Sequence, residues 1–250
     1  MDYIFFLGSG RSGTKFTGRF MKSIDNTLIS EHEYIGNRNF SLLSYYLKNT
    51  NYSRIFLSKV KEEIESSFNG EVFSDSNGYL SFASKTLEEV FKPKKIYHLV
   101  RDPRMVVSSL LVRRDPARLQ PMPNDDASLE RWINSDILYQ ICWNWNNVTS
   151  HLIEHHYELL HFEKLISDYE YCREKILNPL GKQMTKEKWE SIVNQKVNKT
   201  RGKMFRFLYS KIKQKHYENR ELIPFEQWSD ADQKVLIEVC GENMKKLGYL

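Results

Sequence analysis

The residues whose types and spacing suggest chemistry begin with the segment GSGRSGTK, at residues 8–15. It joins a predicted strand to a predicted helix. Glycines let the backbone curl until successive N–H groups point inward at an anion, and the helix N-terminus adds the positive end of its dipole. Side-chain donors come from Arg11, Ser12, Thr14 and Lys15. We therefore predict a loop that holds a phosphate-like group.

This loop departs from the nucleotide-binding pattern G-x-x-x-x-G-K-[ST]. Gly8 and Gly13 match its glycines, but Thr14 stands at the lysine position and Lys15 at the position of the Mg²⁺-binding hydroxyl. A hydroxyl one residue early does not hold the same metal geometry. Arg11 can supply the cation that the lysine normally supplies. The loop is therefore predicted to bind its anion without the usual Mg²⁺–triphosphate arrangement.

A second candidate anion site is the segment VRDPRMVVSS, at residues 100–109. Arg101 lies at the exit of a predicted strand, which Pro103 ends. Ser109 follows in the helix that should fold back beside the strand end. An arginine and a serine placed in this way can bind one phosphate together, through a charge-assisted fork and a hydroxyl. Taken alone, the segment is better interpreted as a surface turn.

The elements that must position these residues are four apolar runs and the helical patterns between and after them. The runs lie at residues 4–7, 71–74, 95–100 and 157–162, and the helical patterns at 14–23, 41–47, 55–68, 105–113, 129–155 and 231–247. Strands that alternate with helices favour an α/β protein. We predict a single domain over residues 1–250, with a three-layer α/β/α fold around a mainly parallel central sheet, as in P-loop NTPases. Ligands of such sheets bind beyond the carboxyl ends of the strands, where both loops lie.

The net charge of the 250-residue chain is +5, which suits an anionic ligand. A charge of this size does not by itself indicate nucleic acid. The basic residues concentrate at residues 199–215, which are interpreted as a solvated helix or loop. Residues 119–126 are the best candidate for a flexible loop or lid.

Three cysteines, Cys142, Cys172 and Cys240, are far apart and form no C-x-x-C motif. This spacing argues against a disulfide framework and a zinc site, and favours a reducing, cytoplasmic location. No apolar stretch approaches the roughly 18 residues that a membrane-spanning helix needs. The first apolar run lacks the basic region of a signal peptide and is expected to be a buried strand.

The two anion motifs together resemble the PAPS-dependent sulfotransferase family, whose donor is 3′-phosphoadenosine 5′-phosphosulfate (PAPS). In that family the first loop holds the 5′-phosphosulfate and the second holds the 3′-phosphate. Weaker similarities are the tryptophans at residues 143 and 145, the segment LHFEKL at 160–165, and Trp228 followed by CGENMKKLGY at 240–249. The resemblance implies PAPS as donor, PAP as product and no metal. The nucleotide-binding residues that it implies are Gly10, Arg11, Ser12, Gly13, Thr14, Lys15, Phe16, Arg101, Ser109, Arg201 and Gly202.

Four of these positions depart from the family pattern. Lys15 replaces a second threonine. Phe16 stands where cytosolic members carry a tryptophan that stacks on adenine, and its smaller ring offers less stacking area. Arg201 and Gly202 are a loose counterpart of an Arg-Lys-Gly segment and are expected to make a third phosphate contact.

Sulfuryl transfer by in-line displacement depends mainly on positioning and charge stabilisation, for which Arg11 is the first candidate. The acceptor also needs a general base. Sulfotransferases of carbohydrates and tyrosine carry a catalytic glutamate in the region that corresponds to the segment SEHEY, at residues 30–34. This resemblance makes Glu33 the first choice, Glu31 the second and His32 the third. Asp75 lies where cytosolic members place a histidine and remains open as a base or as an acceptor-orienting residue.

Two other functions stay open at this point. A P-loop nucleotide kinase or NTPase requires Mg²⁺-dependent ATP binding, against which the order of Thr14 and Lys15 counts. A non-catalytic nucleotide-binding protein would retain the pocket and tolerate substitution of residues 31–33. The expected acceptor is a small molecule, a carbohydrate or a peptide. We expect no nucleic acid partner, and the sequence carries no signal for an oligomeric state.

Overall fold

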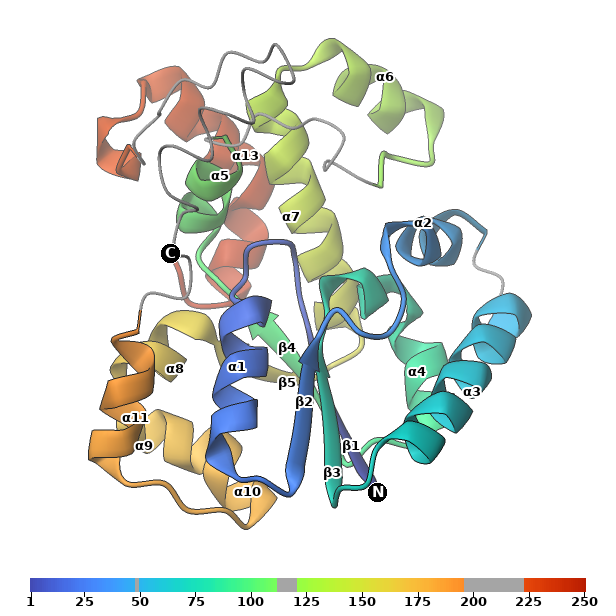
Figure 1. Ribbon diagram of the computed structural model, residues 1–250. Coiled ribbons are helices and arrows are strands. Elements are labelled where there is room, and N and C mark those ends of the chain that lie inside the picture. Colours follow the sequence, from blue (N-terminus) through green and yellow to red (C-terminus); the bar gives the residue numbers. More distant parts are fainter. Residues whose placement is uncertain (48–49, 112–120, 196–222) are drawn as a thin grey trace, which may run out of the picture.

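Five parallel strands form the centre of the computed structural model, in the order β2-β3-β1-β4-β5 (Figure 1). The structure describes residues 1–47, 50–111, 121–195 and 223–250. The strands are β1 (Asp2–Leu7), β2 (Leu28–His32), β3 (Val72–Ser76), β4 (Lys95–Val100) and β5 (Glu158–His161). The predicted fold class, a three-layer α/β/α arrangement with a parallel central sheet, is confirmed.

The central position of β1 follows from its sequence, DYIFFL, in which every residue after Asp2 is buried. Ile4 and Phe6 belong to the core cluster on one face of the sheet, whereas Phe5 and Leu7 belong to the cluster on the other. A strand that is apolar on both faces is stable only between two covered faces. Because β4 pairs with β1 in parallel, the loops that follow these two strands open at the same edge of the sheet.

Helices cover both faces and the carboxyl end of the sheet (Figure 1). The face that packs on α1 also contacts the helices between residues 162 and 193, whereas α3 and α4 cover the other face. A third core cluster joins α5, α7 and α13 beyond the end of β4. The helices are α1 (Thr14–Ile24), α2 (Arg38–Leu47), α3 (Thr50–Ser67), α4 (Ser84–Phe91), α5 (Pro103–Leu111), α6 (Asp126–Asn134), α7 (Ile137–Glu154), α8 (Phe162–Ser167), α9 (Tyr169–Cys172), α10 (Asn178–Leu180), α11 (Lys186–Val193) and α13 (Asp230–Lys246), with the 3-10 helices η1 (Gly78–Ala83) and η4 (Phe225–Gln227) and the π-helix η3 (Arg173–Leu177).

The four predicted strands are all present, but the sequence pattern missed β2. It contains only two strongly apolar residues, Leu28 and Ile29, and pairs on one side alone, with β3. The predicted helical pattern over residues 129–155 is divided into α6 and α7. The division falls at Asp136, whose carboxylate caps α7 by accepting the N–H of Tyr139 at 2.9 Å.

Three predicted segments lie partly or wholly outside the described residues: the helix at 105–113, of which residues 105–111 are described, the basic stretch and the lid. The basic stretch at 199–215 is entirely outside, and of the predicted lid only residues 121–126 are described. Across the described ranges, no helix combines the length and the apolar character that a membrane crossing requires.

The connection from β1 to α1 turns through a left-handed residue, Gly13, with φ of 105°. A Cβ atom at Gly13 would lie 2.2 Å from the ring of Phe162, which follows β5. By contrast, a Cβ atom at Gly10 would have no atom within 4 Å. Gly13 is therefore required both by its backbone conformation and by its close packing, whereas Gly10 is not.

The turn after β2 is held by a buried carboxylate on the neighbouring strand. Asp75 in β3 is fully buried and accepts the backbone N–H groups of Tyr34 and Ile35 at 3.3 and 2.9 Å. The Nδ2 atom of Asn77 donates to the same carboxylate at 3.0 Å. Burial raises the pKa of Asp75 to about 6, although these hydrogen bonds oppose the shift.

We expect Gly13→Ala to lower the free energy of unfolding by about 2 kcal/mol or more, because it adds left-handed strain and a clash. The matched variant Gly10→Ala should change stability by less than about 0.5 kcal/mol. Urea unfolding measures both. Equal losses in the two variants would contradict the packing seen at Gly13.

The buried carboxylate predicts a pH dependence of stability. The pKa of Asp75, about 6 in the folded chain, lies above its ordinary 3.8, so the folded state binds the extra proton. Its contribution is therefore greatest below the ordinary value and is lost as the pH rises through 6. Between pH 7.5 and 4.5, the wild type should gain about 1–3 kcal/mol relative to Asp75→Asn. Parallel stability profiles for the two proteins in urea would exclude this titration.

Candidate functional site

The loop between β1 and α1 is tightly curled and pressed against β4. The N–H of Ser12 donates to the carbonyl of Ser9 at 3.2 Å, and Arg11 adopts a positive φ of 71°. A Cβ atom on Gly8 would lie only 2.2 Å from the carbonyl oxygen of Leu99. The Oγ atom of Ser12 is buried and has no hydrogen-bond partner among the described residues. Such an unpaired buried hydroxyl requires an explanation, which a bound anion would provide.

The second motif meets this loop directly. The guanidinium of Arg101 donates through Nη1 to the carbonyl oxygen of Arg11 at 3.2 Å. In the other direction, Nε of Arg11 donates to Oγ of Ser109, in α5, at 2.9 Å. The structure thus brings together two arginines and a serine that are distant in sequence, on one edge of the sheet.

The environment of Arg101 is partly apolar. Its guanidinium carbon lies 5.1 Å from the centre of the Phe162 ring. Burial lowers the pKa of Arg101, while the carboxylates of Glu163 and Asp102 raise it. An arginine keeps its charge under such conditions, so a partly desolvated cation is held beside the loop.

The end of β2 brings a second group of polar side chains to the start of α1. Nε2 of His32 lies 3.1 Å from Oγ1 of Thr14 and 3.7 Å from Oε1 of Glu33. Burial lowers the pKa of His32, Glu33 opposes this shift, and the nearby charge of Lys15 adds to it. The lowered pKa favours a neutral imidazole at physiological pH, able to exchange a proton with its neighbours.

Glu31 faces away from this group. Ser30 and His32 contact α1, through the carbonyl of Gly18 and the hydroxyl of Thr14. Because side chains alternate along a strand, Glu31 lies on the opposite face of the sheet. It is the cross-strand neighbour of Asp75 there, and its charge contributes to the raised pKa of Tyr34. Asp75 and Asn77 are also withdrawn from the site, because both are fully buried and hold the turn after β2.

Phe16 lies in the hydrophobic core and is only 6% exposed. Its ring packs edge-on against Phe162, with centroids 5.7 Å apart, and parallel to Phe20 at 6.0 Å. Its area is used by the core in this conformation. The aromatic ring beside the cationic groups is instead Phe162. Phe162 belongs to the segment LHFEKL, whose sequence alone predicts no contact with the cationic groups.

Two further residues that sequence reasoning did not assign support the turn of Arg101. They are Trp145, whose indole N–H donates to the carbonyl of Arg101 at 3.2 Å, and Glu163, whose carboxylate accepts the N–H of Asp102 at 3.0 Å. The tryptophan pair and the LHFEKL segment were the available signals, but neither reveals which backbone group is contacted.

The remaining predicted residues have simple placements. Lys15 is exposed on the first turn of α1. Arg201 and Gly202 lie outside the described residues. Within the described ranges, no three His, Cys, Asp or Glu side chains gather closely enough to hold a metal ion.

Comparisons with known proteins bear on this geometry. A family model described as "Sulfotransferase domain" matches residues 2–246. The fold is similar to the sulfotransferase domain from the curacin biosynthetic pathway, with 14% sequence identity, coverage of 95% of this chain and 96% of that one, and a TM-score of 0.51. It is also similar to mouse sulfotransferase SULT7A1 complexed with PAP, with 15% identity, coverage of 97% and 84%, and a TM-score of 0.50. No curated protein matches the sequence.

At these identities the solved structures show a shared fold, and the family assignment comes from the sequence model. That model extends from the first residue of β1 to the last residue of α13. It therefore includes both loops that meet at Arg11 and Arg101. From this match, the chain belongs to the sulfotransferase domain family.

Proposed function

We propose that this chain transfers a sulfuryl group from PAPS to a hydroxyl or amine acceptor and releases PAP. One observation carries the proposal: the cluster of Arg11, Arg101 and Ser109, linked by contacts of 3.2 and 2.9 Å. These residues come from the two motifs that resemble the nucleotide-binding segments of the family. The presence of PAP in the mouse SULT7A1 structure, which shares the fold, supports the same ligand.

The residues present fit a nucleotide with phosphates at both ends. The curled loop offers backbone N–H groups, the unpaired hydroxyl of Ser12 and the charge of Arg11 to the 5′ end. Arg101 and Ser109 would hold the 3′-phosphate, which is the group that distinguishes PAP from ADP. A partly desolvated arginine gains more from an incoming phosphate than an exposed one does, because its charge is less screened.

PAPS supplies a sulfuryl group on a phosphate leaving group. In the transfer, the bond from sulfur to the bridging phosphate oxygen breaks and a bond from sulfur to the acceptor oxygen or nitrogen forms. Negative charge develops on the leaving phosphate, and Arg11 with the loop N–H groups is placed to stabilise it. The acceptor loses one proton, which a base on the enzyme must accept.

Glu33 remains the first candidate for this base. It follows the last residue of β2 in a left-handed conformation, with φ of 57°, and its carboxylate is exposed beside His32. His32 becomes the second candidate, because it contacts Thr14 of the phosphate loop. Glu31 drops to third place, because it lies on the other face of the sheet.

A cytoplasmic location is part of the proposal. It rests on Cys142, Cys172 and Cys240, all of which are buried and unpaired. The acceptor class proposed from the family is a small molecule, a carbohydrate or a peptide.

Calorimetry with PAP and ADP, with and without EDTA, tests the proposed donor. PAP should bind at least about tenfold more tightly than ADP in both conditions, because only PAP has a phosphate for Arg101. Equal affinities, or binding that requires Mg²⁺, would refute the proposal and favour a P-loop kinase or NTPase.

The arginine cluster can be tested by substitution. We expect Arg101→Ala to weaken PAP about 10- to 100-fold, and AMP by less than about threefold, because AMP lacks the 3′-phosphate. Arg54→Ala is the matched control, since Arg54 pairs with Glu89 on the surface of α3 and α4. A similar loss for PAP and AMP would remove Arg101 from the 3′-phosphate site.

The base can be tested with a pair of glutamate variants. Glu33→Gln should lower turnover about 100-fold or more with PAP affinity unchanged, whereas Glu31→Gln on the opposite face should retain turnover. Turnover is followed with labelled PAPS and a panel of acceptors. If Glu33→Gln is fully active and His32→Ala is not, the role belongs to His32. Full activity in both Glu33→Gln and His32→Ala would exclude Glu33 and His32 as the base.

A further inference from the structure

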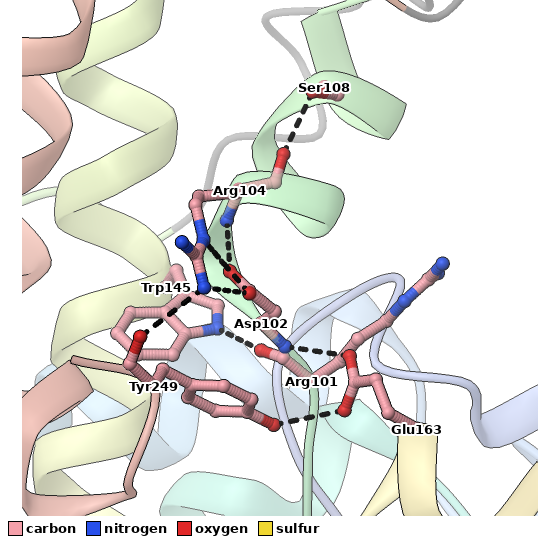
Figure 2. A network of polar contacts seen from close by, with 7 residues as sticks. All are labelled: Arg101, Asp102, Arg104, Ser108, Trp145, Glu163 and Tyr249. Atoms are coloured by element: carbon pink, nitrogen blue, oxygen red, sulfur yellow. Dashed lines mark hydrogen bonds and ion pairs between the residues drawn. The ribbon is translucent and has the colours of Figure 1, made fainter. Parts of the chain in front are cut away.

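A closed ring of polar contacts surrounds the turn that carries Arg101 (Figure 2). The ring consists of Asp102, Arg104, Glu163 and Tyr249. These residues come from three segments that are far apart in sequence: the turn from β4 into α5, the start of α8 and the segment after α13. The side chain of Arg101 points out of this ring (Figure 2). Arg101 reaches the loop after β1 by donating to the carbonyl of Arg11, so the ring acts on the site through the turn that carries Arg101.

The peptide group between Arg101 and Asp102 is held from both sides. Its carbonyl accepts the indole N–H of Trp145 at 3.2 Å, and its N–H donates to Oε1 of Glu163 at 3.0 Å. Both donor and acceptor of this peptide are therefore used by side chains from different elements. Such a peptide cannot rotate without losing a hydrogen bond, which fixes the direction in which the Arg101 side chain leaves the strand.

Glu163 is in turn held by Tyr249. The phenol of Tyr249 donates to Oε2 of Glu163 at 3.1 Å. The backbone carbonyl of Tyr249 accepts from Nη2 of Arg104 at 3.3 Å. Arg104 closes the ring by donating to both carboxylate oxygens of Asp102, at 2.9 Å from Nε to Oδ1 and 2.6 Å from Nη2 to Oδ2.

The charges in this ring affect Arg101. Glu163 is the first of the carboxylates whose charge raises the pKa of Arg101, and Asp102 is the second. Either carboxylate could pair with the guanidinium and compete with a phosphate. Burial raises the pKa of Tyr249, as do the charge of Glu163 and their hydrogen bond, so the phenol stays a neutral donor. Tyr249 thus restrains Glu163, and Arg104 restrains Asp102.

We propose that Glu163 and Tyr249 are positioning residues for the 3′-phosphate: they orient the Arg101–Asp102 peptide and keep the Glu163 carboxylate from pairing with Arg101. This inference rests on the proposed function. It assigns a role in nucleotide selectivity to a residue after α13, separated from Arg101 by more than half of the sequence.

The test is the selectivity for PAP over AMP in Tyr249→Phe, measured by calorimetry on the full chain. Loss of one hydrogen bond to Glu163 should weaken PAP about fivefold and leave AMP within about twofold. Tyr171→Phe is the matched control, because its hydroxyl accepts the N–H of His161 at 3.0 Å and belongs to no part of the ring. That control should retain the wild-type ratio.

A double-mutant cycle decides whether Tyr249 acts through Arg101. In an Arg101→Ala background, Tyr249→Phe should have no further effect on PAP affinity. A purely structural role would lower the thermal midpoint and weaken PAP and AMP alike, and the effect would persist without Arg101. Either result, or an unchanged ratio in Tyr249→Phe, overturns the inference. If the wild type itself does not prefer PAP over AMP, the proposed function fails instead.

Discussion

The site depends on the parallel pairing of β1 with β4. Their register, from Ile4 opposite Lys95 to Leu7 opposite His98, brings both strand exits to one edge of the sheet, with β4 continuing past His98 to Val100. The loop after β1 is pressed onto β4, because Gly8 lies against the carbonyl of Leu99. This close packing allows the Arg101 guanidinium to reach the carbonyl of Arg11 at 3.2 Å. Any side chain at Gly8 would separate the two loops and thereby divide the candidate site.

Most of what positions the site could be predicted from the sequence, and the exceptions have physical causes. β1 and β4 are continuous apolar runs with one plausible structure, so both loops were placed at strand ends. β2 was missed because an edge strand with the sequence LISEH carries little apolar signal. That omission matters, because the alternation along β2 separates His32 from Glu31, and a loop of unknown geometry could not distinguish them. The core position of Phe16 depends on its contact with Phe162, which no local pattern encodes.

Charge burial at this edge follows a consistent logic. A desolvated arginine is costly unless hydrogen bonds or opposite charges compensate it. Arg101 has a carbonyl acceptor, an aromatic ring and two nearby carboxylates, but each carboxylate is already bonded to another donor. The cation is therefore stable without a phosphate and still gains from one. The same environment explains why two arginines suffice to bind an anion. In a partly apolar setting they interact with it more strongly than they would in water.

The carboxylates at the strand ends divide into structural and chemical groups by what they contact. Backbone N–H groups beyond the last pair of a strand have no ladder partner, and buried ones need an acceptor. Asp75 accepts two of these N–H groups after β2, and it lies in β3, the strand beside β2. Glu163 accepts one such N–H group after β4, and it follows β5, the strand beside β4. Asp102 is occupied by Arg104. Among these described carboxylates on the loop side of the sheet, Glu33 alone contacts only a histidine, at 3.7 Å. Its exposed carboxylate therefore supports none of the backbone N–H groups named above and is open to an incoming acceptor, which is the geometric condition that a general base must meet.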